Sequence, residues 1–62
     1  MRTVYSLEPI TESAKSWIAD NVQAEPWQWL GGTLVVEHNY VDDITAGMIE
    51  DGIVEDIDFR LN

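Results

Sequence analysis

The paired glycines Gly31 and Gly32 constrain the fold of this chain more than any other feature. They lie inside the stretch WQWLGGTLVV, between two runs of residues that favour strands. Glycine accepts the positive φ that both central positions of a type I′ turn require, so the pair predicts a two-residue β-hairpin turn. With this turn, the two strands cover residues 27–30 and 33–36.

The alternation of side chains along these two strands predicts one strongly apolar face. Successive side chains on a strand point to opposite sides of the sheet. The apolar face carries Trp27, Trp29, Leu34 and Val36. We expect this face, with both indoles, to lie in the core beneath the helices.

A strand and a helix are expected before the hairpin. Residues 3–7 alternate as a short strand, which should end near Pro9 because proline cannot donate to a sheet ladder. Thr11 is a suitable helix N-cap, and apolar side chains then recur at helical spacing as far as Val22. Pro26 ends the connection to the hairpin.

A second helix and a last strand are expected after the hairpin. Asn39 is the predicted N-cap, and Gly52 is the predicted stop because the residue after the last helical turn is often a left-handed glycine. Gly47 falls inside this helix at a cost of about 1 kcal/mol relative to alanine. A large side chain or the other helix is therefore expected to approach closely there. Residues 57–61 alternate as the last strand, beginning with Ile57.

The predicted order of elements is strand, helix, strand, strand, helix, strand. This βαββαβ arrangement is a compact ferredoxin-like sandwich of class α+β, in which a four-stranded antiparallel sheet carries both helices on one face. Residues 1–62 are expected to form one domain. The alternative lacks the strand at residues 27–30 and has a three-stranded sheet with a tryptophan-rich loop under the helices.

The chain is strongly acidic, and most of the acids lie in its second half. Twelve Asp and Glu residues against three Lys and Arg residues give a net charge of −9. Such a charge repels nucleic acid and anionic membranes, but attracts basic protein surfaces that normally hold nucleic acid. The acidic face predicted to bind a partner consists of Glu37, Asp42, Asp43, Glu50, Asp51, Glu55, Asp56 and Asp58.

Residue patterns typical of catalytic, metal and phosphate sites are missing from the sequence. Without cysteine, disulfides and thiolate zinc sites are excluded, which suits a reducing, cytoplasmic interior. His38, the single histidine, is interpreted as an ordinary surface or hydrogen-bonded residue. The acidic pairs do not match the ligand spacing of a calcium loop, and no apolar run approaches the ~20 residues that span a bilayer. We therefore expect no enzyme activity, no cofactor and no dedicated metal site.

Two functions fit this description. Short, acidic, cysteine-free chains resemble the inhibitors that phages and plasmids make against host nucleases, restriction and CRISPR complexes, or polymerase. This resemblance of class implies an anti-defence protein whose carboxylates act as a nucleic-acid mimic in a partner's basic groove. The alternative is a homodimeric scaffold module that uses an exposed strand edge or the helix-free face of the sheet, where Val4, Leu30 and Val35 form an apolar patch.

Overall fold

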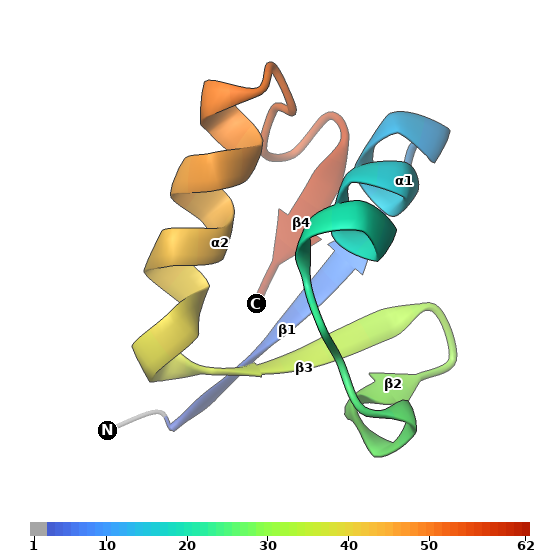
Figure 1. Cartoon of the computed structure of the whole chain (residues 1–62), viewed down its shortest axis with the longest axis vertical. Coiled ribbons are helices and arrows are strands. Elements are labelled where there is room, and N and C mark those ends of the chain that lie inside the picture. The colour runs from blue at the N-terminus through green and yellow to red at the C-terminus, as the bar shows by residue number, and fades with distance from the viewer. Residues whose placement is uncertain (1–2) are drawn as a thin grey trace.

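The computed structural model describes residues 3–62, which fold into an antiparallel sheet and two α-helices (Figure 1). The elements in chain order are β1 (Val4–Pro9), α1 (Glu12–Asn21), the 3₁₀ helix η1 (Pro26–Gln28), β2 (Trp29–Leu30), β3 (Thr33–Glu37), α2 (His38–Glu50) and β4 (Phe59–Leu61). The four strands lie in the order β2-β3-β1-β4, each antiparallel to its neighbour. This confirms the predicted α+β class and the ferredoxin-like order with four strands.

The core lies between the helices and one face of the sheet. Leu7, Leu34 and Phe59 of the sheet are fully buried, as are Ala14 of α1 and Met48 of α2. Both helices contribute to this single cluster, so both cover the same sheet face. None of the helices in the described part of the chain is long and apolar enough to cross a membrane.

The glycine turn forms at the predicted place with a different conformation. The pairs nearest the turn are Leu30 with Thr33 and Trp29 with Leu34, which confirms the predicted register. Gly31 has a φ of +64°, whereas Gly32 lies outside the positive-φ region. Positive φ at the first central position alone is the sign pattern of a type II′ turn, so the type I′ prediction is wrong.

The helix ends are set by local hydrogen bonds at two of the predicted positions. Thr11 caps α1, because its Oγ1 accepts a hydrogen bond from the Ala14 N–H at 3.3 Å. Gly52, with a φ of +87°, follows α2, and the Ile53 N–H donates to the Met48 oxygen at 2.8 Å. This bond closes a Schellman motif, so the predicted stop is confirmed.

Gly47 is required where α2 passes the indole of Trp17 in α1. A Cβ at position 47 would lie 3.0 Å from Trp17 Cζ2 and 3.2 Å from Cη2. The same indole donates from Nε1 to Asp51 Oδ2 at 2.6 Å. The predicted close approach at Gly47 is thus confirmed, and Trp17 joins the two helices.

Two element boundaries differ from the prediction. Strand β1 extends beyond the predicted residues 3–7 and ends at Pro9, which pairs with Phe59 of β4. The missing N–H of Pro9 is tolerated because β3 does not reach this position. Helix α2 begins at His38 with Glu37 as its N-cap, so Asn39 lies in the first turn. The extended backbone of Glu37 at the end of β3 passes directly into the helix, which leaves no linker residue to act as a cap.

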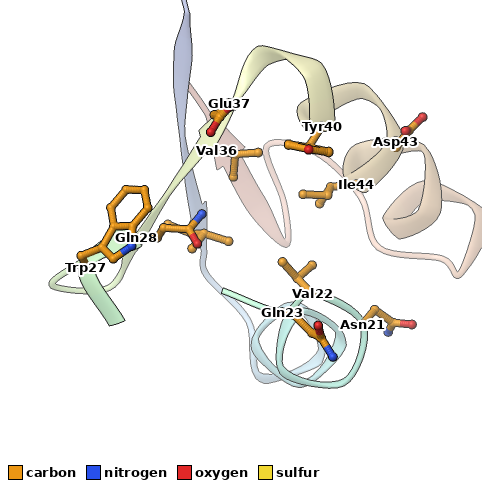
Figure 2. A pocket seen from close by; sticks show the side chains of 11 residues that line it. Asn21, Val22, Gln23, Trp27, Gln28, Val36, Glu37, Tyr40, Asp43 and Ile44 are labelled. Carbon is orange, nitrogen blue, oxygen red and sulfur yellow. The ribbon is translucent and has the colours of Figure 1, made fainter. Parts of the chain in front are cut away.

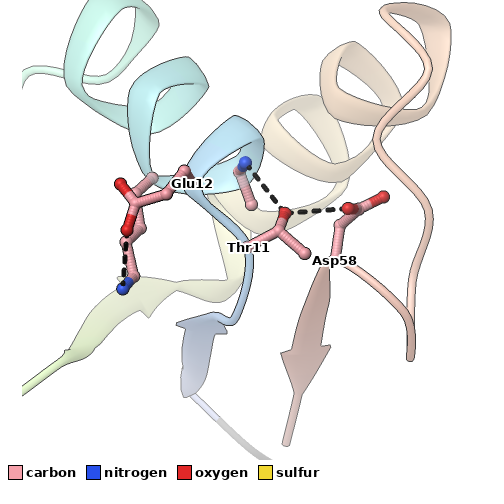
Figure 3. Close-up of polar contacts among 5 residues, drawn as sticks. Thr11, Glu12 and Asp58 are labelled. Atoms are coloured by element: carbon pink, nitrogen blue, oxygen red, sulfur yellow. Dashed lines mark hydrogen bonds and ion pairs between the residues drawn. The ribbon is translucent and has the colours of Figure 1, made fainter.

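Ile57 is predicted to begin the last strand, but lies two residues before the start of β4 at Phe59. It is 67% exposed and lies in a turn before β4. The Asp58 carboxylate accepts a hydrogen bond from the Thr11 Oγ1–H at 2.8 Å (Figure 3). Its other oxygen accepts one from the Val54 N–H, also at 2.8 Å. Asp56 adopts a φ of +70° in the same turn. These polar contacts close the turn and leave the Ile57 side chain in solvent.

Candidate interaction site

Trp27 is the largest departure from the predicted structure. It lies in η1, outside the sheet, and is 69% exposed. Pro26 occupies the first position of η1, and the Glu25 N–H donates to Gln28 Oε1 at 2.8 Å in a capping box. The prediction that Trp27 pairs with Val36 beneath the helices is therefore wrong. The Glu25-Pro26 pair, with Gln28 three residues after Glu25, is the sequence pattern that indicates this 3₁₀ helix. The strand prediction did not take it into account.

Because β2 is short, β3 has an open edge beside Trp27. On one side β3 pairs with β1 along residues 34–37. On the other side it pairs with β2 only at residues 33 and 34, and none of the described strands continues along residues 35–37. Gln28 Nε2 donates to the Val35 oxygen at 3.2 Å, which replaces one bond of the missing ladder.

The backbone of β3 directs two N–H groups toward this open edge. The His38 N–H donates to the Thr3 oxygen at 3.0 Å, just beyond the last paired residues of β1 and β3. Because the bonding direction alternates along an antiparallel strand, the N–H groups of Val35 and Glu37 point away from β1. An edge of this kind can accept a further strand.

A hollow of about 420 Å³ lies next to Trp27, between the end of α1 and the start of α2 (Figure 2). Its aliphatic lining comes from Val22, Leu34, Val36 and Ile44. Trp27 and Tyr40 stand on opposite sides of it (Figure 2), and Tyr40 is 59% exposed. The site therefore combines an aliphatic floor with two accessible aromatic rings.

The charge at this hollow is negative. Glu37 and Asp43 are the charged side chains among the described residues that line it, and both are exposed. The C-terminal end of α1 and the N-terminal part of α2 also border the hollow, and their opposite dipole ends offset each other. The carboxylates of Glu37 and Asp43 therefore make the local electrostatic potential negative.

The predicted acidic residues extend along α2 and into the turn beyond it. Glu37 and Asp43 border the hollow, whereas Asp42 and Glu50 are exposed elsewhere on the helix. The remaining members, at the far end of α2 and in the following turn, are Asp51, Glu55, Asp56 and Asp58.

Two of these acids are engaged inside the molecule. The hydrogen bond from the Val54 N–H, with a second one from Thr11, lowers the pKa of Asp58 below its usual value. Asp51 accepts the bond from the Trp17 indole. These two carboxylates therefore accept hydrogen bonds from within the fold. Asp58 is partly buried, whereas Asp51 and the other members of the predicted acidic face are exposed.

Most carboxylates have no cationic neighbour in the described structure. Within residues 3–62 the one ion pair joins Lys15 Nζ to Glu12 Oε1 at 3.6 Å, in α1 (Figure 3). In the same range no group of three or more His, Asp or Glu side chains could hold a metal ion. Within residues 3–62, therefore, no ion pair neutralises the carboxylates of the second half, and their negative charge faces solvent.

The helix-free face of the sheet carries the predicted apolar patch. Val4 is 47% exposed and Leu30 is 66% exposed, whereas Val35 is partly buried. His38 is exposed, and together with Val4, Val35 and Trp27 it lines a second, smaller hollow of about 300 Å³.

The comparisons with known proteins yield no relative. The chain matches no protein-family model, no curated protein and no solved structure. Inferences about its function therefore rest on its own side chains.

Proposed function

We propose that the protein is a small acidic interaction module that inhibits a partner by occupying its basic, nucleic-acid-binding surface. The observation that carries this proposal is the net charge of −9, with carboxylates exposed along α2 and a single ion pair within residues 3–62. Carboxylates on a rigid body can substitute for phosphates and accelerate the encounter with a positive surface.

The rigidity of α2 supports this role. Its C-terminal end is held by the Schellman motif at Gly52, and its flank is held by the contact of Gly47 with Trp17. A helix whose backbone is already held in place loses little backbone conformational entropy when a partner binds. The inhibitor therefore works by steric and electrostatic blockade and needs no catalytic group.

The partner class follows from the sign of the charge. Nucleases, restriction or CRISPR complexes, and polymerases all present basic grooves to nucleic acid. An inhibitor of this kind would serve a phage or mobile element against host defence, inside the cytoplasm. It would bind neither nucleic acid nor membrane directly, since both carry negative charge.

Displacement of fluorescent duplex DNA from a restriction endonuclease, an RNA polymerase and a CRISPR effector complex tests this proposal. We expect inhibition of at least one of them, weakening steeply when NaCl is raised from about 50 mM to about 300 mM because salt screens exposed charges. Absence of displacement from every partner at low salt, or displacement that is independent of salt, would contradict the proposal.

A matched pair of variants separates the acids of the second half from net charge alone. D42N/E50Q/E55Q and E8Q/E12Q/D20N each neutralise three exposed carboxylates and change the net charge from −9 to −6. We expect the first variant to lose about tenfold or more in inhibition, since it removes the proposed contacts, and the second to change less. Equal losses would mean that charge acts without a defined surface.

The alternative function is a homodimeric scaffold that pairs through the helix-free face. Exposure of Val4 and Leu30 on that face favours it. Repulsion between two chains of charge −9 counts against it. Sedimentation of the wild type and of Val35→Asp discriminates: a monomer that the substitution leaves unchanged rules out this alternative.

A further inference from the structure

We propose that the hollow beside Trp27 holds an arginine side chain of the partner, presented on an extended segment that pairs with the open edge of β3. The inference rests on the proposed function for the basic character of the partner. It adds the place where that partner is anchored and the kind of side chain that is recognised.

The lining of the hollow suits the two parts of an arginine side chain. The aliphatic stem would lie against Val22, Val36 and Ile44, as long cationic side chains commonly do on apolar surface. The planar guanidinium would stack on the ring of Trp27 or Tyr40, which stand at opposite sides of the hollow (Figure 2). Trp27, at 69% exposed, is also the type of residue that dominates binding energy at protein interfaces.

The charge around the hollow selects a cation over an anion or a second copy of the chain. Glu37 and Asp43 offer carboxylate acceptors, and no Lys or Arg of the described chain lines the site. A second copy would bring another −9 charge into this field.

The open edge of β3 explains how such a side chain would be presented. The Gln28 side chain already bonds to the Val35 oxygen on this edge. Beyond it the Glu37 N–H points toward the edge, where a carbonyl group of an added strand can accept it. Side chains of an added strand alternate between the two faces of the sheet. A residue opposite Val36 would therefore point to the helix-covered face, where the hollow lies.

Calorimetric titration with the blocked peptide acetyl-Thr-Val-Arg-Val-Thr-amide tests this inference. We expect measurable binding at about 50 mM NaCl, and binding weaker by about tenfold when citrulline replaces arginine, because citrulline keeps the shape and loses the charge. Equal affinity of the two peptides, or binding of neither, would overturn the inference.

Two matched pairs of variants locate the binding site. Asp43→Asn and Asp42→Asn change adjacent exposed residues and give the same net charge of −8 from −9, but only Asp43 lines the hollow. Trp27→Ala and Leu30→Ala each truncate an exposed apolar side chain, and only Trp27 lines the hollow. We expect the first member of each pair to weaken peptide binding by about fivefold or more, and the second to change it by less than about twofold. Equal effects within the two pairs would overturn the site.

The peptide titration and the DNA-displacement assay fail independently. If the arginine peptide binds as expected while no DNA-binding partner is inhibited, the proposed function fails and the site remains. If partners are inhibited while peptide binding is absent or insensitive to Trp27→Ala, the arginine site fails and the acidic function remains. Concentration-dependent dimerisation that Trp27→Ala abolishes would overturn the inference in favour of a second copy as occupant.

Discussion

The two ends of the molecule use their polar groups in opposite ways. The closed end is defined by Thr11, Val54, Asp58 and Phe59. The open end is defined by Trp27, Val35, Glu37 and Tyr40. At the closed end, hydrogen bonds between side chains and backbone link α1, the turn at 54–58 and β4. At the open end, two aromatic rings, a carboxylate and two backbone N–H groups face outward.

The caps of the two helices show the same contrast. Helix α1 begins at the closed end with a side-chain cap from Thr11, whereas α2 begins at the open end at His38, and its N-cap Glu37 makes no side-chain cap bond. Polar groups that bond inside the protein stabilise the fold, but are no longer available to a partner. We therefore infer that the closed end stabilises the fold and that the open end binds a partner.

Phe59→Ala should have the largest effect on stability and would test the closed end directly. Phe59 is fully buried, and truncation of such a residue costs about 3–5 kcal/mol. That is comparable to the whole stability expected of a small domain, at roughly 0.05–0.15 kcal/mol per residue. Circular dichroism during urea unfolding should find the variant largely unfolded without denaturant. A cooperative transition at the wild-type midpoint would contradict the assignment.

Asp58→Asn should remove the pH dependence that the closed end contributes. The hydrogen bonds from Val54 and Thr11 lower the folded-state pKa of Asp58, so its stabilisation is present above the unfolded pKa of about 3.9 and is lost as pH falls through the folded value. The wild type should melt at a higher temperature than the variant at about pH 6, and the gap should narrow toward about pH 2. All other carboxylates are the same in both proteins, so their effects cancel from the difference in melting temperature. A difference that does not change with pH would contradict the stabilising role of the Asp58 carboxylate.

Gly47→Ala should destabilise the protein moderately. The new Cβ gains helix propensity of about 1 kcal/mol, but crowds the Trp17 ring, and overpacking typically costs about 1–3 kcal/mol. The bond from Trp17 to Asp51 restrains the ring, so we expect a net loss of about 1 kcal/mol. In a Trp17→Leu background the same substitution should stabilise instead. A gain of stability in both backgrounds would show that the ring moves aside freely.

Several local features could be predicted from the sequence because neighbouring residues decide them. Thr11 as a cap, Gly52 as a stop and the close approach at Gly47 depend on short-range backbone geometry or on steric exclusion. The register of the glycine hairpin also follows from the turn itself.

Two of the errors occur where a polar side chain closes a turn in place of an expected strand. Alternation places Trp27 and Ile57 in strands, but the Gln28 side chain accepts a bond from the Glu25 N–H and the Asp58 side chain accepts one from the Val54 N–H. Such competition depends on the partners that the fold supplies, so the hydrophobic pattern does not reveal it. Glu37 and Asp43 are among the predicted acids, but the sequence pattern does not predict the hollow that they line together with Trp27.

Trp27→Ala should have the smallest effect on stability, in contrast to Phe59→Ala. Its side chain is 69% exposed, and substitutions at such surface positions usually change the unfolding free energy by less than about 0.5 kcal/mol. Urea unfolding should give nearly the wild-type midpoint. A loss comparable to that of a core residue would mean that the open end also stabilises the fold.

The most direct test of the contrast between the two ends is a titration of the arginine peptide followed by ¹H–¹⁵N NMR of the wild-type protein. We expect the resonances of the Trp27 indole N–H and of the Val35 and Glu37 amides to shift, while those of the Val54, Asp58 and Phe59 amides do not change. Shifts concentrated at the closed end, or spread evenly over both ends, would contradict it.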